Sequence, residues 1–90
     1  MKRVKVSFKP SFLRELKKLE PALQDEAREK IELFKNPAKH AALRVHKLKG
    51  RMTGRMSFSV NYRYRIVFKY TDTSKREGVL LAIGDHDVYR

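Results

Sequence analysis

The segment 62–70, YRYRIVFKY, alternates large apolar side chains with positively charged ones. Successive side chains of a β-strand point to opposite faces of the sheet, so this alternation predicts a strand with one buried and one basic face. The apolar face would comprise Tyr62, Tyr64, Ile66, Phe68 and Tyr70, and the basic face Arg63, Arg65 and Lys69. A strand of this kind requires a sheet that is covered on one side only.

Three other segments carry strand patterns. Residues 2–8 alternate around Val4, Val6 and Phe8, and Pro10 stops this strand. Residues 55–60 place Met56, Phe58 and Val60 on one face and Arg55, Ser57 and Ser59 on the other. The polar turn 72–78 precedes an apolar run, 79–83, which predicts a last, well buried strand.

Two helices are expected between the first strand and the others. Pro10 and Pro21 each suit the first turn of a helix, where the missing amide hydrogen costs no hydrogen bond. The apolar stripes at helical spacing are Phe12, Leu16 and Leu19, then Leu23, Ala27, Ile31 and Phe34. Asn36 and Pro37 end the second helix, and the weakly patterned stretch 38–45 predicts a loop or a residual helical turn.

The order strand, helix, helix, three strands predicts an α+β fold, in which a helical hairpin packs on one face of an antiparallel sheet. A chain of 90 residues is expected to form a single domain spanning 1–90. The open face of the sheet would then carry Arg63 and Arg65, together with Arg55, Ser57 and Ser59. We therefore expect a cationic groove across this face.

The net charge also points to an anionic partner. With 22 Lys and Arg against 10 Asp and Glu, the formal charge is +12, and no acidic residue occurs between Glu32 and Asp72. Such a basic block fits phosphate contacts, an acidic protein partner or an anionic lipid surface, and a merely solvated basic face is the alternative. The lipid interpretation is weak, because the cations follow strands and not one amphipathic helix.

Absent residue types narrow the class further. The chain has no cysteine, which excludes disulfides, thiol nucleophiles and cysteine-ligated zinc or iron–sulfur sites. The longest apolar run, 79–83, is far too short to span a membrane, and no apolar signal region follows the first residues. We expect a cytoplasmic domain without membrane association, metal or cofactor.

Three stretches resemble the RelE/ParE superfamily of bacterial toxin–antitoxin toxins: KVSFKPSFLRELKKL, HKLKGRMTGRMSFSVNYRYRIVF and LLAIGDHDVYR. The resemblance implies the same strand–helix–helix–strands fold and an antitoxin as partner. For the RelE-like, HigB-like and YafQ-like branches it implies cleavage of mRNA on the ribosome. For the ParE branch it implies inhibition of DNA gyrase, and a non-catalytic RNA-binding relative is a third possibility.

The resemblance also implies site residues. His86 matches a catalytic histidine of YafQ-like toxins, Arg65 matches the arginine that binds the scissile phosphate, and Tyr89 matches a C-terminal tyrosine that stacks on a base or assists proton transfer. His46 matches a histidine of YafQ-like toxins that contributes to activity. RNA cleavage by a neighbouring 2′-hydroxyl needs a base, charge stabilisation at the phosphoryl oxygens and an acid, and no metal is obligatory. His46 and His86 are both candidates for the base.

Structural roles are also open for these residues, since His86 could be held by Asp85 or Asp87 and Tyr89 could cap the core. The chain departs from RelE-like toxins in offering Ser57 and Ser59 where lysines are common. The remaining cations are expected to act together as a phosphate-contacting patch. These are Lys47, Lys49, Arg51, Arg55, Arg63 and Lys69.

Overall fold

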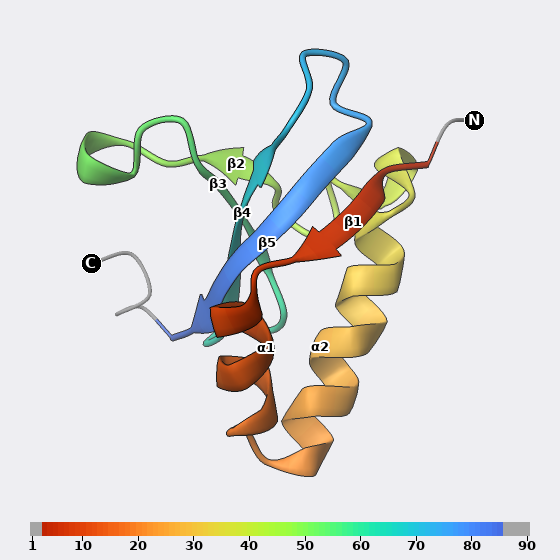
Figure 1. Ribbon diagram of the computed structural model, residues 1–90. Coiled ribbons are helices and arrows are strands. Elements are labelled where there is room, and N and C mark those ends of the chain that lie inside the picture. Colours follow the sequence, from red (N-terminus) through yellow and green to blue (C-terminus); the bar gives the residue numbers. More distant parts are fainter. Residues whose placement is uncertain (1–2, 86–90) are drawn as a thin grey trace.

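The computed structural model describes residues 3–85, which form two helices and five strands (Figure 1). The predicted α+β class and the order of the main elements are confirmed. In chain order the elements are β1 (Lys5–Phe8), α1 (Pro10–Lys17), α2 (Pro21–Phe34), a 3₁₀ turn (Pro37–Lys39), β2 (His46–Lys47), a second 3₁₀ turn (Gly50–Met52), β3 (Met56–Ser59), β4 (Arg65–Tyr70) and β5 (Glu77–Gly84).

Both helices begin at the prolines that the sequence indicates, and they run antiparallel, side by side (Figure 1). After α2, the side chain of Asn36 accepts a hydrogen bond from the backbone amide of Ala38, which starts the 3₁₀ turn at Pro37. The stretch 38–45 is a series of turns, as expected, and buries Leu43.

The sheet has the order β1-β5-β4-β3-β2 and is mixed. The prediction of a wholly antiparallel sheet is wrong at one edge, because β1 pairs with β5 in parallel, with Lys5 opposite Glu77 and Phe8 opposite Leu80. β1 and β5 are the first and last strands in the chain, so no tight turn sets their relative direction. The short strand β2 pairs antiparallel with β3 and was not predicted.

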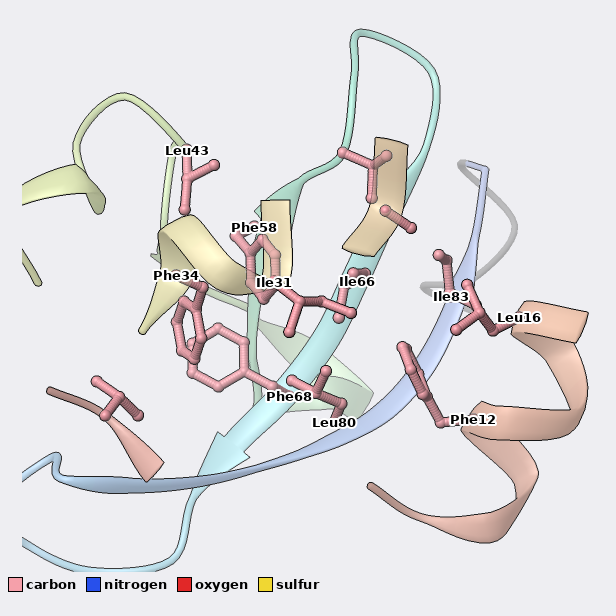
Figure 2. Close-up of a cluster of buried hydrophobic side chains, with 13 residues drawn as sticks. Phe12, Leu16, Ile31, Phe34, Leu43, Phe58, Ile66, Phe68, Leu80 and Ile83 are labelled. Atoms are coloured by element: carbon pink, nitrogen blue, oxygen red, sulfur yellow. The ribbon is translucent and has the colours of Figure 1, made fainter. Parts of the chain in front are cut away.

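The core lies between the helical hairpin and one face of the sheet. Three aromatic rings form its centre: Phe34 of α2 stacks on Phe58 of β3 and meets Phe68 of β4 edge-on, both with ring centroids 4.6 Å apart (Figure 2). Phe12 and Leu16 bring α1 into the same cluster. These positions are those that the helical and strand patterns predict.

The expected register of β4 holds, but its start is shifted. Arg63 is exposed and Phe68 is fully buried, whereas Tyr64 and Arg65 are half-buried. Tyr62 is 90% exposed, so its assignment to the buried face was wrong. The chain turns tightly at this point, because the amide of Val60 donates to the carbonyl oxygen of Tyr64 at 2.9 Å, and β4 begins only at Arg65.

An irregularity in β5 changes which residues face the helices. Along β4 and β5, Val67 pairs with Ala82 but Phe68 pairs with Leu80, which leaves Leu81 as an extra residue. Such a bulge shifts the alternation by one position. Leu80 and Ile83 therefore both face the core, although a regular strand would point them to opposite sides.

The face of the sheet opposite the helices, which we call the outer face, differs from the open groove expected. Ser57 and Val67 lie opposite each other at its centre, and both are 0% exposed. The predicted exposure of Ser57 is therefore wrong, and the polar and basic groups lie around this covered centre.

Among the residues described, no helix is both long enough and apolar enough to cross a membrane.

Candidate nucleic-acid interface

Pairing across β3 brings His46 and Arg65 to the same face of the sheet. His46 lies opposite Ser57 and Arg65 lies opposite Ser59, and side chains of directly opposite residues share a face. Ser57 and Ser59 are two positions apart on β3. With ordinary strand spacings, the Cα atoms of His46 and Arg65 are about 12 Å apart. At this distance, both side chains can contact the same nucleotide.

The guanidinium of Arg65 is anchored on one side only. Its Nη1 atom donates to the carbonyl oxygen of Asn61 at 2.6 Å and to that of Tyr64 at 3.1 Å. A guanidinium has five N–H donors in a planar fork, and Nε and Nη2 donate to no residue of the described range 3–85, so their donors can serve a ligand. Half burial and two carbonyl contacts hold this fork in a defined direction, which suits bidentate binding of a phosphate.

His46 is exposed and held in one ring orientation. Its Nδ1 atom lies 2.8 Å from the carbonyl oxygen of Arg44. A carbonyl oxygen only accepts, so we assign the proton to Nδ1. In the neutral ring, the other nitrogen, Nε2, then carries the lone pair and can accept a proton from a substrate hydroxyl.

Asn61 organises the turn before Arg65. Its Oδ1 accepts from the amides of Arg63 and Tyr64 at 2.9 and 2.8 Å, and its Nδ2 donates to Oε1 of Glu26 on α2 at 2.8 Å. The backbone carbonyl of the same residue holds Arg65. Asn61 thus connects the turn and α2 through its side chain, and it holds the candidate phosphate ligand Arg65 through its backbone carbonyl.

A cavity of about 230 Å³ opens beside this turn. It is lined on one side by residues of the turn and of β3 and β4, and on the other by the segment that leads into β2. The lining residues are Ala42, Arg44, Ser59, Asn61, Tyr62 and Arg65. These lining residues include two arginines together with residues that carry hydroxyl and amide groups, and none of the described residues that line the cavity is acidic.

The residues of the predicted phosphate-contacting patch are spread over four places, of which the turn before β4 holds Arg63. Lys49, Arg51 and Arg55 are exposed on the segment 48–55 between β2 and β3, which we call the basic arm and which projects from the sheet (Figure 1). Lys69 is on the outer face with Arg65 and lies four residues further along β4. Lys47 pairs with Met56 and so belongs to the opposite face from His46.

Arg63 contacts the ring of Tyr64, with its Cζ atom 5.7 Å from the ring centroid.

Gly50 and Gly54 adopt positive φ angles of 67° and 91°, which permits the compact turn of the basic arm. The arm is closed by the amide of Leu48, which donates to the carbonyl oxygen of Arg55 at 3.0 Å.

The basic residues between positions 44 and 69 form no ion pair with any residue of the described range 3–85. Both ion pairs found there join residues of or next to α2: Arg28 with Asp25 and Lys35 with Glu32. The positive charge of the β2–β4 region is therefore not neutralised by these carboxylates. In the same part of the chain, no group of three His, Asp or Glu side chains could hold a metal ion.

Two predicted site residues, His86 and Tyr89, lie outside the described residues. Conversely, the sequence patterns did not single out Arg44 or Asn61, and they placed Tyr62 in the core. The dipeptide Asn61-Tyr62 did indicate a turn, and an aromatic residue at the tip of a turn is exposed. The involvement of Arg44 has no local signal, because it depends on how the segment 38–45 folds back.

A helical hairpin on one face of a five-stranded mixed sheet is the fold of the RelE/ParE toxins, as the sequence motifs predicted. The chain is similar to a protein of the RelBE2 toxin–antitoxin complex from Mycobacterium tuberculosis, with 22% identity over 96% of this chain and 94% of that chain and a TM-score of 0.76.

It is also similar to YafQ from E. coli strain BL21(DE3), with 14% identity over 96% and 97% of the two chains and a TM-score of 0.74. A chain of the YoeB–YefM complex from Staphylococcus aureus shares 20% identity over 93% and 98% of the chains, with a TM-score of 0.69. At these identities the likeness establishes a shared fold. No protein-family profile and no curated protein matches the sequence.

Proposed function

We propose that this protein is the toxin of a type II toxin–antitoxin system and acts as a metal-independent endoribonuclease that cleaves mRNA on the ribosome and so inhibits translation. The observation that carries the proposal is the placement of His46 and Arg65 on one face of the sheet, with an orienting contact for each. The fold shared with YafQ and with the RelBE2 and YoeB–YefM complexes supports it.

In the proposed reaction, Nε2 of His46 accepts the proton of a ribose 2′-hydroxyl, whose oxygen attacks the adjacent phosphorus. Arg65 donates from Nε and Nη2 to the phosphoryl oxygens, where negative charge increases in the transition state. The P–O5′ bond then breaks, and the 5′-oxygen takes a proton from an acid. The products are a 2′,3′-cyclic phosphate and a 5′-hydroxyl.

We propose His86 as the general acid and Tyr89 as the residue that stacks on a nucleobase. Both assignments rest on the sequence motif. β5 ends at Gly84, directly opposite Arg65, and His86 follows two positions later in the chain. His86 also remains the alternative for the general base. Lys47, Lys49, Arg51, Arg55, Arg63 and Lys69 would contribute a salt-sensitive attraction for the RNA or the ribosome.

The proposed protein partner is a cognate antitoxin that covers the basic surface in the cytoplasm. RelBE2 and YoeB–YefM are toxin–antitoxin complexes, which supports a partner of this class. An acidic segment would associate rapidly with a chain of net charge +12, and its affinity should fall as salt rises. An affinity that does not change between low and high salt would argue against this partner chemistry.

The activity can be tested by primer extension on a defined mRNA in a purified translation system, with a parallel reaction that lacks ribosomes. We expect ribosome-dependent breaks with the wild type, and rates about 10²–10⁴-fold lower for His46→Gln. Arg65→Ala and His86→Ala should also lose the breaks. Arg28→Ala, which removes the same charge from α2 behind the opposite face of the sheet, is the matched control.

Intact mRNA in the presence of folded wild-type protein would contradict the proposal. If the same protein inhibits DNA gyrase in a supercoiling assay, the ParE-like alternative holds. If it does neither but still binds RNA, a non-catalytic relative is the better description. Full cleavage by His46→Gln with loss of cleavage by His86→Ala would move the general base to His86.

A further inference from the structure

The turn that precedes β4 places the aromatic residue Tyr62 at a cavity that two arginines also line. Tyr62 is 90% exposed and lines the same cavity as Arg44 and Arg65. Among the described residues, the other exposed large apolar side chains are Phe8 and Leu13, each 40% exposed and both on the side of α1. The exposure of Tyr62 is therefore exceptional, and it occurs next to the candidate phosphate site.

This exposure is built into the turn. The side chain of Asn61 accepts from the amides of Arg63 and Tyr64 and is itself held by Glu26 of α2. The backbone on both sides of Tyr62 is thus restrained by hydrogen bonds, so the turn that carries the ring is already ordered before a ligand binds. Its neighbour Tyr64 is covered by Arg63 at 5.7 Å, whereas Tyr62 makes no ring contact with the described residues.

Arg44 is the second unusual residue of the cavity. Its φ of +58° lies in the left-handed region, which residues with a Cβ atom adopt at a cost. In this conformation its carbonyl oxygen holds the ring of His46, and Arg44 lines the cavity together with Arg65. Arg44 forms no ion pair within residues 3–85.

Two guanidinium groups around a small polar cavity match a phosphate, and an exposed phenol ring beside them matches a nucleobase. We propose that this cavity is a nucleotide subsite for single-stranded RNA, in which Arg44 and Arg65 hold one phosphate and Tyr62 stacks on the adjoining base. The inference rests on the proposed function for the class of substrate. It adds Arg44 and Tyr62 as residues that position the RNA.

The subsite makes separate demands on the two added residues. Stacking by Tyr62 requires a base but no phosphate, so it acts only on RNA that carries bases. The charge of Arg44 acts on the backbone, whether or not bases are present. A substrate analogue without bases therefore distinguishes the two contributions.

The test measures binding without cleavage. The probes are a fluorescently labelled 2′-O-methyl oligoribonucleotide, which lacks the attacking hydroxyl, and an abasic phosphodiester chain of the same length. Affinities are measured by fluorescence anisotropy at two salt concentrations. The variants are Tyr62→Ala, Tyr62→Phe and Arg44→Ala, with Arg28→Ala as the control for loss of one positive charge.

We expect Tyr62→Ala to weaken binding of the base-bearing probe by about fivefold to a hundredfold and to leave the abasic probe unchanged. Tyr62→Phe keeps the ring and should bind like the wild type. Arg44→Ala should weaken both probes and lower the salt dependence by about one phosphate contact. Arg28→Ala should have the smallest effect.

Equal binding of the base-bearing probe by the wild type and Tyr62→Ala would overturn the stacking role, and so would equal losses with both probes. An Arg44→Ala effect no larger than that of Arg28→Ala would overturn the phosphate role. Either result with mRNA cleavage intact would remove the subsite and leave the proposed function standing. A wild type that binds neither probe and cleaves no mRNA would remove both.

Discussion

The ring of His46 is oriented by a backbone carbonyl: Nδ1 lies 2.8 Å from the carbonyl oxygen of Arg44. His40 shows the reverse arrangement, since its Nε2 lies 2.7 Å from the carbonyl oxygen of Phe34 and its ring stacks on that of Phe34 at 4.8 Å. Nε2 of His46 therefore has no hydrogen-bond partner within residues 3–85 and lies on the outer face of the sheet, whereas Nε2 of His40 binds the last carbonyl of α2.

This difference predicts opposite tautomers for the two neutral rings. His46 should carry its proton on Nδ1 and His40 on Nε2, because each carbonyl oxygen can only accept. Long-range ¹H–¹⁵N correlation spectra recorded at alkaline pH distinguish the two forms. An Nε2–H form of His46 would contradict the assignment of Nε2 as the proton acceptor.

Asn61 should couple the turn before β4 to α2. Replacing it with Ala removes an acceptor for two backbone amides and the donor to Glu26, so we expect a loss of roughly 1–3 kcal/mol in the free energy of unfolding. Urea unfolding of Asn61→Ala, Glu26→Ala and the double variant measures the coupling. Glu26→Gln keeps the acceptor oxygen and is the control.

We expect the losses of Asn61→Ala and Glu26→Ala to be non-additive, because the two residues share one hydrogen bond. Strict additivity would show that Glu26 does not support the turn. Asn61→Ala should also weaken phosphate binding by Arg65, which loses its anchored orientation when the turn moves.

The aromatic cluster should provide a large part of the stability of this small domain. Phe34 is fully buried and has ring contacts with Phe58, Phe68 and His40. Phe34→Ala is expected to lower the free energy of unfolding by about 3–5 kcal/mol, through lost burial and the cavity that remains.

Phe8→Ala is the matched control for Phe34→Ala. Phe8 is 40% exposed, so the same substitution there should cost clearly less. Chemical denaturation of the two variants gives the comparison. Equal losses at the two positions would mean that the cluster around Phe34 is not the centre of the core.

We expect the protein to become less stable at alkaline pH because of the phenol group of Tyr70. Burial raises the pKa of its phenol above the ordinary value of 10.0. Between the unfolded and folded pKa values the unfolded state binds fewer protons, so the free energy of unfolding falls as pH rises through this range. The contribution of Tyr70 to the free energy of unfolding is fully present at pH values below the pKa of the unfolded state.

Unfolding free energies of the wild type and Tyr70→Phe, measured at about pH 8 and about pH 11, test this linkage. The difference between the two proteins should shift in favour of Tyr70→Phe at the higher pH. Tyr62→Phe, which removes an exposed phenol, is the control. The same pH dependence in the wild type and Tyr70→Phe would contradict the prediction.

The sequence alone determined the class of fold, because its signals are local. Pro10 and Pro21 start the helices, and side-chain alternation identifies β3 and β4, including the outward direction of Arg65. These features depend on backbone conformations and residue spacings within a few positions. The resemblance of three motifs indicated His46 and Arg65 as candidate site residues, and for Arg65 the alternation pattern also indicated its face of the sheet.

Tertiary structure decided what depends on partners that are distant in the chain. The parallel pairing of β1 with β5 and the bulge at Leu81 arise from contacts between segments that no local pattern relates. The alternation along β3 likewise does not reveal that Ser57 is buried. The approach of Arg44 to Arg65 at the cavity has the same origin. A periodic pattern shows that a side chain points away from its neighbours, but only the packed chain determines what it meets there.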